Sequence, residues 1–359
     1  MKKLYFLFII GAVACGCGDK DRFLFTQIPI EPVMNPDTRV LIKDNSLINV
    51  RLDSGNLIRG ITTNNFFTTT DLFKSFTYNG FSLPATKITP FSYNGKAITV
   101  ASGTPTAPVV HYSTDYGNTF TSVVPTFSPV ISTAGFYSTE LVCVSYIDND
   151  NLLLAYQQKA YTTADSRKFY RLNLTTKVAT RASYFDDAFY PVNIKFTDYK
   201  TGFMLLYRNS SYATFICRTL DTGRTWSEPK EIAKRVITGL QTGTKGNLCA
   251  MEDFGKAYMS ADSGKTWKQP TADLKLTDVH MVNQSVVYGL DGETLVKSTD
   301  TGVTWNTVPS TGYEYINMKK LHFQDEQNGL MYGGQKLYIT ADGGSSWKVL
   351  LYPYKYVIE

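Results

Sequence analysis

The chain has 359 residues, with 36 Lys and Arg against 31 Asp and Glu, and a formal net charge of +5 at pH 7. The basic residues are scattered, without a run that could follow a phosphate backbone, so we expect no nucleic-acid partner. The 24 Tyr, 21 Phe and 26 Gly favour short strands joined by many turns over long helices.

The first residues have the composition of an export leader. Met1-Lys-Lys precedes an apolar run from Leu4 to Ala14, which is about as long as a signal peptide and too short to span a bilayer. The run ends in Ala12-Val-Ala-Cys15-Gly-Cys17, which resembles a bacterial lipoprotein box acylated at Cys15, with Cys17 as the alternative. An ordinary secretory leader is the other interpretation. We expect residues 1–14 to be a lipoprotein signal peptide, and the protein to be lipid-anchored in the bacterial cell envelope, periplasmic or on the outer surface.

Residues 15–37 contain three prolines and predict a tether, because proline disfavours both helices and central strands. Residues 38–359 are expected to form a single domain. Its three cysteines, Cys143, Cys217 and Cys249, stand among apolar residues and predict buried thiols rather than disulfides. The three histidines are far apart in the sequence, so we expect satisfied sheet residues, no metal site and no cofactor.

One octapeptide pattern recurs five times: [Ser/Thr]-x-Asp-x-Gly-x-[Ser/Thr]-[Trp/Phe]. We call each match a box, and the box aspartates are Asp115, Asp221, Asp262, Asp300 and Asp342. The chain's four tryptophans each end a box: Trp226, Trp267, Trp305 and Trp347. The carboxylate is expected to accept backbone N–H bonds, the glycine to take positive φ, and the aromatic ring to fill the gap between neighbouring sheets.

The spacing of the boxes predicts the fold. A degenerate box at Asp71 has Phe73 where glycine belongs, and most steps between box aspartates are about 40 residues. Around the last box, residues 319–351 contain four short apolar or alternating stretches, which is typical of a four-stranded propeller blade. The gap of 106 residues between Asp115 and Asp221 fits two blades, with the missing turn at Asn173. We therefore predict an all-β, seven-bladed propeller of four-stranded antiparallel blades, with six blades as the fallback.

The box resembles the Asp-box, or bacterial neuraminidase (BNR) repeat, of sialidases, sortilin-type receptors and photosystem II assembly-factor-like propellers. A second repeat, Phe-x-Asp-x-x-x-Gly at Phe196 and Phe323, is similar to the assembly-factor type, which implies a binding or assembly role. The sialidase resemblance implies three arginines that clamp a carboxylate. The first of these arginines belongs to an Arg-Ile-Pro element in sialidases, and the nearest equivalent here, Arg39-Val-Leu41, lacks the proline. No motif supports Arg208 or Arg235 as the other two arginines of the clamp. No GxSxG or HExxH motif is present.

Long connections between Thr126 and Tyr212 are the expected place for a ligand, because functional residues gather on loops of a rigid scaffold. The candidate binding residues are Tyr161, Asp186, Asp187, Tyr190, Arg208 and Tyr212. Such side chains suit a sugar or a peptide, whereas the alternative is that the aromatic rings pack under their own loops. The sequence thus predicts a monomeric, envelope-anchored, non-catalytic binding or assembly propeller that recognises a glycan or an envelope protein. A glycoside hydrolase of sialidase type is the alternative.

Overall fold

The computed structural model describes residues 47–351 apart from gaps at 54–56, 63–65, 74–76, 80–90, 95–96, 161–165, 183–184, 186–187, 199, 244–245, 253–254, 272, 313–317 and 334–335. All described residues belong to the unit that spans residues 34–359. The leader, Cys15, Cys17, the tether and Arg39 lie outside the described residues.

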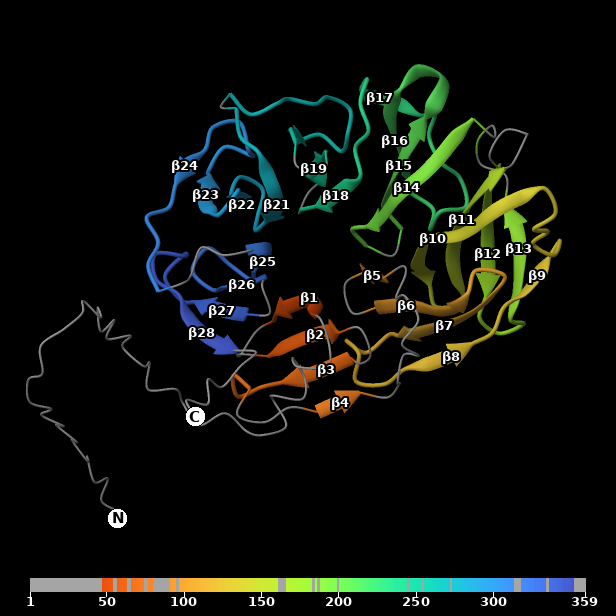
Figure 1. The fold of residues 1–359 in the computed structure, drawn as a ribbon, viewed down its shortest axis with the longest axis horizontal. Helices are drawn as coiled ribbons and strands as arrows, with labels where there is room; N and C mark the ends of the chain where they lie inside the picture. The colour runs from red at the N-terminus through yellow and green to blue at the C-terminus, as the bar shows by residue number, and fades with distance from the viewer. Residues whose placement is uncertain are drawn as a thin grey trace, which may run out of the picture. The chain divides into compact units, whose positions relative to one another are not determined.

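Within this unit, seven small sheets follow one another in a ring (Figure 1). Blade 1 contains β1 (Leu47–Leu52), β2 (Ile58–Thr62), β3 (Phe66–Thr69) and β4 (Thr77–Asn79), and blade 2 contains β5 (Phe91–Asn94), β6 (Ala97–Thr104), β7 (Ala107–Ser113) and β8 (Thr121–Val123). Blade 3 contains β9 (Thr126–Ser128), β10 (Phe136–Asp148), β11 (Asn151–Ala160), β12 (Ser166–Asn173) and β13 (Val178–Ala182). Blade 4 contains β14 (Phe189–Phe196), β15 (Gly202–Arg208), β16 (Ala213–Thr219) and β17 (Lys230–Ala233), and blade 5 contains β18 (Gly239–Thr242), β19 (Leu248–Met251) and β20 (Ala257–Ser260). Blade 6 contains β21 (Leu276–Met281), β22 (Val287–Asp291), β23 (Thr294–Ser298) and β24 (Asn306–Thr307), and blade 7 contains β25 (Met318–Phe323), β26 (Gly329–Gly333), β27 (Lys336–Thr340) and β28 (Lys348–Leu351). The prediction of an all-β propeller with seven blades, rather than six, is confirmed.

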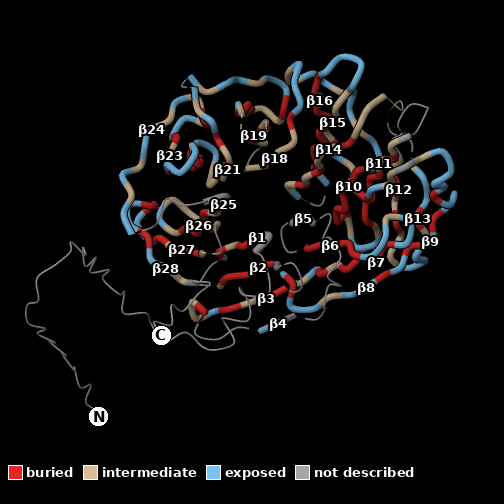
Figure 2. The backbone as a smooth tube through the Cα atoms, viewed as in Figure 1, coloured by how far each residue is buried: buried red, intermediate tan, exposed pale blue. Residues whose placement is uncertain are grey.

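Figure 2 shows buried residues along the strands of the blades, and the apolar clusters that they form lie between neighbouring blades. Strand β19 is buried at all four positions because it has a neighbouring blade on both faces. Leu248 and Ala250 pack with side chains of blade 4, whereas Cys249 and Met251 pack with side chains of blade 6. One apolar strand thus serves two interfaces, since successive side chains point to opposite faces of a sheet.

Two blades depart from the four-stranded plan. In blade 3, β9 pairs in parallel with the fourth strand, β13, and makes a fifth strand. In blade 5 the fourth strand is reduced to one bridge, in which Met259 and Lys268 exchange both backbone hydrogen bonds. The next partner in that antiparallel register is Pro270 opposite Ala257, and proline has no N–H to extend the ladder.

The expected long connections are shorter than predicted. Residues 126–128 form β9, β10 begins at Phe136, β11 continues through Gln157 to Ala160, and Tyr190 already belongs to β14. These segments were predicted as loops because they contain polar residues. Gln158 is fully buried, and its amide donates hydrogen bonds to the Ser132 carbonyl and the Thr139 hydroxyl, so a polar residue is accommodated within the sheet.

Blades 7 and 1 meet through packing in the described part of the chain. Leu330, Tyr332 and Leu337 of blade 7 form one apolar cluster with residues of blade 1, including Val50 and Phe67. The Leu52 N–H also donates to His322 Nδ1 at 3.3 Å. No strand among the described residues is shared between these two blades.

The three cysteines of the domain, Cys143, Cys217 and Cys249, are free and buried, as predicted. Burial raises the pKa of the Cys143 thiol to about 12. The described residues include one short 3-10 helix, Asn209–Ser211, and no helix long and apolar enough to cross a membrane.

Candidate functional site

The boxes form the turns between the third and fourth strands. In the box of blade 6, the Ser298 hydroxyl donates to Asp300 Oδ1 at 2.8 Å, and the Gly302 N–H donates to Ser298 Oγ at 2.8 Å. The N–H and the hydroxyl of Thr304 donate to Asp300 Oδ1 and Oδ2 at 2.8 and 2.6 Å. Gly302 takes φ +82°, as expected, and Thr301 before it also takes positive φ, which the sequence did not predict.

The boxes all lie at one end of the strands. Thr301 N–H donates to the carbonyl of Ser285, in the turn between the first and second strands, and Thr222 N–H donates in the same way to Lys200. We call this end, made by the boxes and the first-to-second-strand turns, the box face. The opposite end is made by the second-to-third-strand turns and the connections between blades, and we call it the loop face.

The box aromatics pack at interfaces with the preceding blade. Trp305 packs against the cluster shared by blades 5 and 6, and Trp347 is buried in the cluster shared by blades 6 and 7. Phe120 of the first full box contacts Phe66 of blade 1, with ring centroids 5.3 Å apart. The box residues are therefore fully used in turn closure and packing.

Both irregular boxes keep the turn. In blade 1, Thr69 Oγ1 donates to Asp71 and accepts the Phe73 N–H, so Phe73 occupies the glycine position at φ +67°. In blade 3, Asn173 Oδ1 accepts the N–H groups of Thr175 and Thr176 at 3.1 and 2.8 Å. The missing turn therefore lies at Asn173, as predicted.

The second repeat is explained by close packing in the first hairpin. Phe196 pairs with Gly202, and Phe323 pairs with Gly329, across the first two strands of their blades. A Cβ on either glycine would stand 2.7 Å from the phenylalanine ring. Asp198 and Asp325 accept the N–H groups within the turns between these partners.

The loop face brings together three of the six predicted binding residues. Tyr190 contacts Tyr207, with ring centroids 6.1 Å apart, and the Arg208 guanidinium lies 4.9 Å from the Phe189 ring centroid. Tyr212 follows in the same turn at φ +50° and is 70% exposed. Tyr161, Asp186 and Asp187 lie outside the described residues.

Tyr207 is a member of this group that the sequence did not single out. Burial raises the pKa of its hydroxyl, and the neighbouring Tyr212 and Tyr190 raise it further. Its position next to the predicted binding residue Arg208 could have indicated it, but the sequence pattern placed Tyr207 at the end of a strand rather than in a loop. We call Tyr190, Tyr207, Arg208 and Tyr212 the tyrosine rim.

Exposed apolar side chains also lie on other connections of the loop face. Val130, between β9 and β10, is 79% exposed, and Val236, between β17 and β18, is 50% exposed. Both lie on connections at the loop face. On the box face, Leu220 is exposed, and Tyr116 is exposed but has the Arg59 guanidinium 4.8 Å above its ring.

The arginines proposed for a sialidase-like clamp have local partners. Arg208 lies over Phe189, and Arg235 Nε lies 3.7 Å from Glu252 Oε1. The geometry of the described residues therefore supplies no argument for a carboxylate clamp at Arg208 and Arg235, and Arg39 lies outside them.

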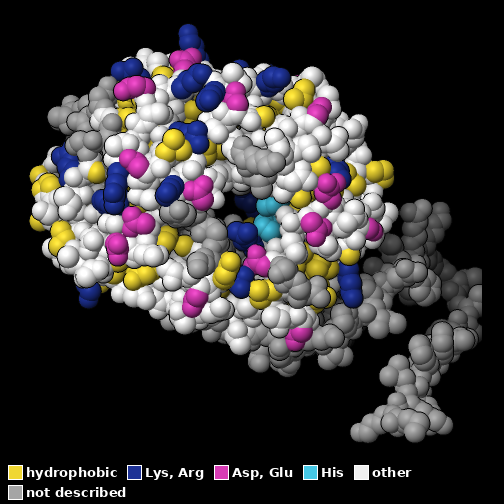
Figure 3. All heavy atoms as spheres, turned by 180° about the vertical axis from the view of Figure 1, so that it is seen from behind, with side chains coloured by type: hydrophobic (Ala, Val, Ile, Leu, Met, Phe, Trp, Pro, Cys, Tyr) yellow, Lys and Arg dark blue, Asp and Glu magenta, His cyan; other side chains and the backbone are white. Residues whose placement is uncertain are grey.

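The histidines are hydrogen-bonded within or between blades, as predicted. His111 lies between the hydroxyls of Ser102 and Ser122, at 3.0 and 2.7 Å. His280 bonds to the backbone of Phe323, and His322 accepts the N–H of Leu52. Histidine side chains, together with Lys and Arg, are visible at the central opening of the ring (Figure 3). Among the described residues, no group of three His, Cys, Asp or Glu could hold a metal ion.

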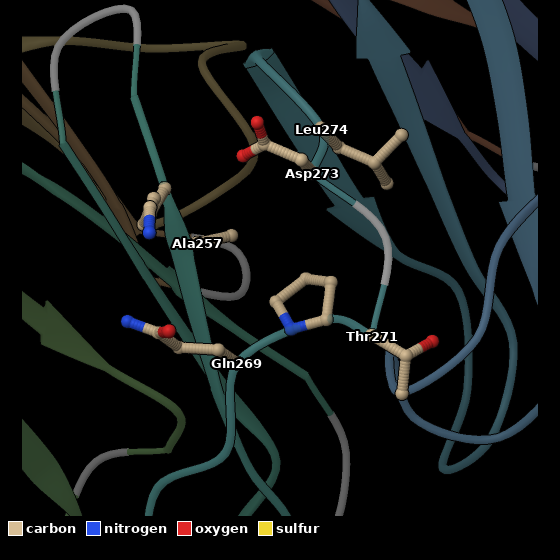
Figure 4. A pocket seen from close by; sticks show the side chains of 7 residues that line it. Ala257, Gln269, Thr271, Asp273 and Leu274 are labelled. Atoms are coloured by element: carbon tan, nitrogen blue, oxygen red, sulfur yellow. The ribbon is translucent and has the colours of Figure 1, made fainter.

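A shallow pocket of about 340 Å³ lies where blade 5 lacks its fourth strand (Figure 4). Ala257 of β20, Gln269, Pro270 and Asp273 are among its lining residues. The pocket follows from the early end of the ladder at Pro270, and its lining shows no cluster of catalytic groups.

The fold and the two faces define this protein as a seven-bladed β-propeller with packed box turns on one face and an aromatic rim on the other. No protein-family model matches the chain, and no curated protein matches its sequence. Among solved structures, it is similar to YCF48 from Cyanidioschyzon merolae, with 15% identity, a TM-score of 0.53 and coverage of 84% of this chain and 96% of that chain. A structure of YCF48 bound to D1 peptide matches with 14% identity, a TM-score of 0.52 and coverage of 83% and 92%. The Dos1 propeller matches with 10% identity, a TM-score of 0.55 and coverage of 84% and 79%. At these identities the similarity shows the fold.

Proposed function

We propose that this protein is a non-catalytic binding or assembly propeller of the Asp-box type. Its tyrosine rim holds a segment of an envelope protein, and a lipid on Cys15 keeps it at a membrane of the bacterial cell envelope. The observation that carries the proposal is the exposure of large apolar side chains on three connections of the loop face, at Val130, Tyr212 and Val236.

The chemistry of the rim suits a peptide. Tyrosine and arginine are the residues that most often supply binding energy in protein interfaces, because they combine a broad flat surface with hydrogen-bonding groups. The backbone between β15 and β16 holds Tyr212 in a left-handed conformation, so its side chain stands clear of the sheet. The YCF48 structure with a D1 peptide supports the proposal as an example of a similar propeller with a peptide partner.

The proposal is tested by capture of partners from a detergent extract of the envelope. The double variant Arg208→Gln/Tyr212→Ser should capture at least tenfold less of the principal partner than the unchanged protein. Leu220→Ser is the matched control, because it removes an exposed apolar side chain from the box face. Equal losses in both variants, or none in either, would contradict a binding role for the tyrosine rim.

A glycan array and a fluorogenic sialoside distinguish the remaining alternatives. Specific glycan retention that depends on Tyr212 would replace the protein partner by a sugar, and sialoside hydrolysis would replace the binding role by a glycosidase. The anchor is tested separately by incorporation of labelled fatty acid. Cys15→Ser should abolish the label and release the protein from membranes, whereas Cys17→Ser should leave both unchanged.

A further inference from the structure

The inner strands bring a group of basic side chains together at the central channel. Arg51 lies on β1, Lys195 on β14, His280 on β21, and Lys320 and His322 on β25. These strands line the centre of the ring (Figure 1), and Lys, Arg and His side chains are visible at its opening (Figure 3). The group is assembled from four blades.

The group lies toward the box face and away from the tyrosine rim. Arg51, Lys195, His280 and His322 each stand one or two residues before the turn to the second strand. Those turns belong to the box face. A ligand of this group would therefore approach from the end of the channel opposite to the tyrosine rim.

Positive charge exceeds negative charge in this group. Asp278 is 2% exposed and accepts a hydrogen bond from Lys320 Nζ at 2.9 Å and one from the Leu321 N–H at 2.9 Å. Arg51 Nε lies 3.7 Å from Asp53, a carboxylate that also pairs with Arg59. No described carboxylate lies within ion-pair distance of Lys195 Nζ. The ion pairs among the described residues therefore bring two carboxylates, Asp278 and Asp53, to this basic group.

Lys195 has an environment that disfavours its own charge. Burial lowers the pKa of its ammonium group, and the positive charges of Lys320 and Arg51 lower it further, against the opposing effects of Cys143 and Asp278. A buried cation beside like charges raises the free energy of the folded protein unless an anion lies nearby. The carboxylate of Asp278 therefore compensates only part of the effect of burial and of the neighbouring cations on Lys195.

Inter-blade bonding accounts for Lys320, His280 and His322 but leaves Lys195 unexplained. Lys320 and Asp278 join blades 6 and 7, and His322 joins blades 7 and 1. The Lys195 side chain makes no hydrogen bond to a described residue, although the side chain of the nearby inner-strand residue Asn193 bonds to the Thr238 carbonyl at 3.2 Å. A half-buried lysine side chain without such a bond serves packing less well than an apolar residue of the same length.

We propose that the box-face end of the central channel binds a small oxyanion, a carboxylate or phosphate group, between Lys195, Arg51 and Lys320. Arginine offers a planar pair of N–H donors that matches two oxygens of such a group, and lysine adds a point charge. The site is separate from the tyrosine rim, so this proposal does not depend on the partner proposed for the rim.

The test is isothermal titration with inorganic phosphate and, separately, with succinate, at constant ionic strength set with chloride. The unchanged protein should bind at least one of them saturably, and Lys195→Met and Arg51→Met should each weaken that binding at least tenfold. Lys234→Met, which removes a cation from an exposed position, should bind as the unchanged protein does. Phosphate alone as ligand would indicate a phosphate source, and succinate alone a carboxylate source.

A second measurement keeps the proposal falsifiable if a variant fails to fold. The Lys195 Cε and Nζ resonances of the full-length folded protein should titrate at a higher pH when the anion is bound, because the anion stabilises the ammonium form. Absence of saturable binding by both anions, or equal weakening in Lys234→Met, would overturn the proposal.

Discussion

Gly302 of the blade 6 box lies directly against Met259 of β20, and a Cβ at position 302 would stand 2.6 Å from the Met259 Cε. The same relationship recurs around the ring. Gly117 meets Phe66 of blade 1, and Gly344 meets Leu295 of blade 6. The box glycine therefore has two functions: it takes a positive φ, and it lets the third strand of the preceding blade approach closely.

Gly302→Ala should separate these two functions. A side chain at φ +82° costs about 1 kcal/mol, and the contact with Met259 adds to that loss. Gly292→Ala is the matched control, because Gly292 has φ +62° and nothing within 4 Å of a Cβ. Urea unfolding should show a larger loss for Gly302→Ala, and equal losses would contradict the close-packing role.

The box tryptophans should differ in their contribution to stability. Trp347 is buried and packs edge-on against Phe323 at 6.1 Å, so Trp347→Ala should lower the free energy of unfolding by about 3–5 kcal/mol. Trp305 is only half-buried, so Trp305→Ala should lose less. Denaturant midpoints of the two variants test this order, with Trp347→Phe as a milder control. A greater loss of stability in Trp305→Ala would show that burial does not determine how much each box tryptophan contributes to stability.

Phe73→Gly is a case in which two effects oppose one another. Restoring glycine would remove the strain of φ +67°, worth about 1 kcal/mol. It would also remove a buried ring, 5.6 Å from Phe67 in the cluster between blades 1 and 7, worth about 3 kcal/mol. The net result should be a loss of about 2 kcal/mol in equilibrium unfolding, and a stabilised variant would refute this balance.

The boxes should make the protein sensitive to acid. Desolvation raises the pKa of Asp300, but hydrogen bonds from Thr304, Ser298 and Val303 outweigh it and lower the pKa to about 2. Because the folded pKa is below the unfolded value, this stabilisation is present above about pH 4 and is lost as the pH falls toward 2. The stability difference between the unchanged protein and Asp300→Asn should therefore shrink from pH 7 to pH 2.5. A constant difference would contradict a role for the carboxylate charge.

The channel histidine His280 should make stability depend on pH in a higher range than the box aspartates do. Burial and the charge of Arg51 lower the pKa of His280 to about 4, against the bond to Phe323. The neutral form is favoured in the folded state, so its stabilisation is complete above about pH 6.5 and is lost as the pH falls toward 4. His280→Gln should lose less stability than the unchanged protein between pH 7 and pH 5. An NMR titration of the His280 ring with a midpoint near 6.5 would contradict the argument.

The sequence predicts the blade number because the box signals one turn per blade in local chemistry. Even the degenerate turn at Asn173 could be placed, since an amide oxygen replaces the carboxylate as acceptor. Strand β9 was missed because three residues, Thr126-Phe-Ser, carry no periodic signal, and their pairing with β13 is a tertiary event.

The sites were harder to predict because they too depend on tertiary contacts between distant parts of the chain. Tyr190 and Tyr212 could be selected as loop aromatics, but their contacts with Tyr207 depend on how two strands end together. The basic group of the channel was missed entirely. Arg51, Lys195 and Lys320 are separated by more than a hundred residues each and meet only when the ring closes.

The junction between blades 1 and 7 is the point at which the ring closes. Other consecutive blades are joined by continuous backbone, whereas these two are joined, in the described residues, by the side chains around Leu52 and Tyr332 and the bond to His322. Thermal motion that separates blades 1 and 7 leaves all seven blades stacked in an open arc with six remaining junctions. Such an arc would widen the channel and part His322 from Leu52. This opening requires no break in the chain, because it separates only packed side chains and one hydrogen bond between a backbone N–H and a histidine.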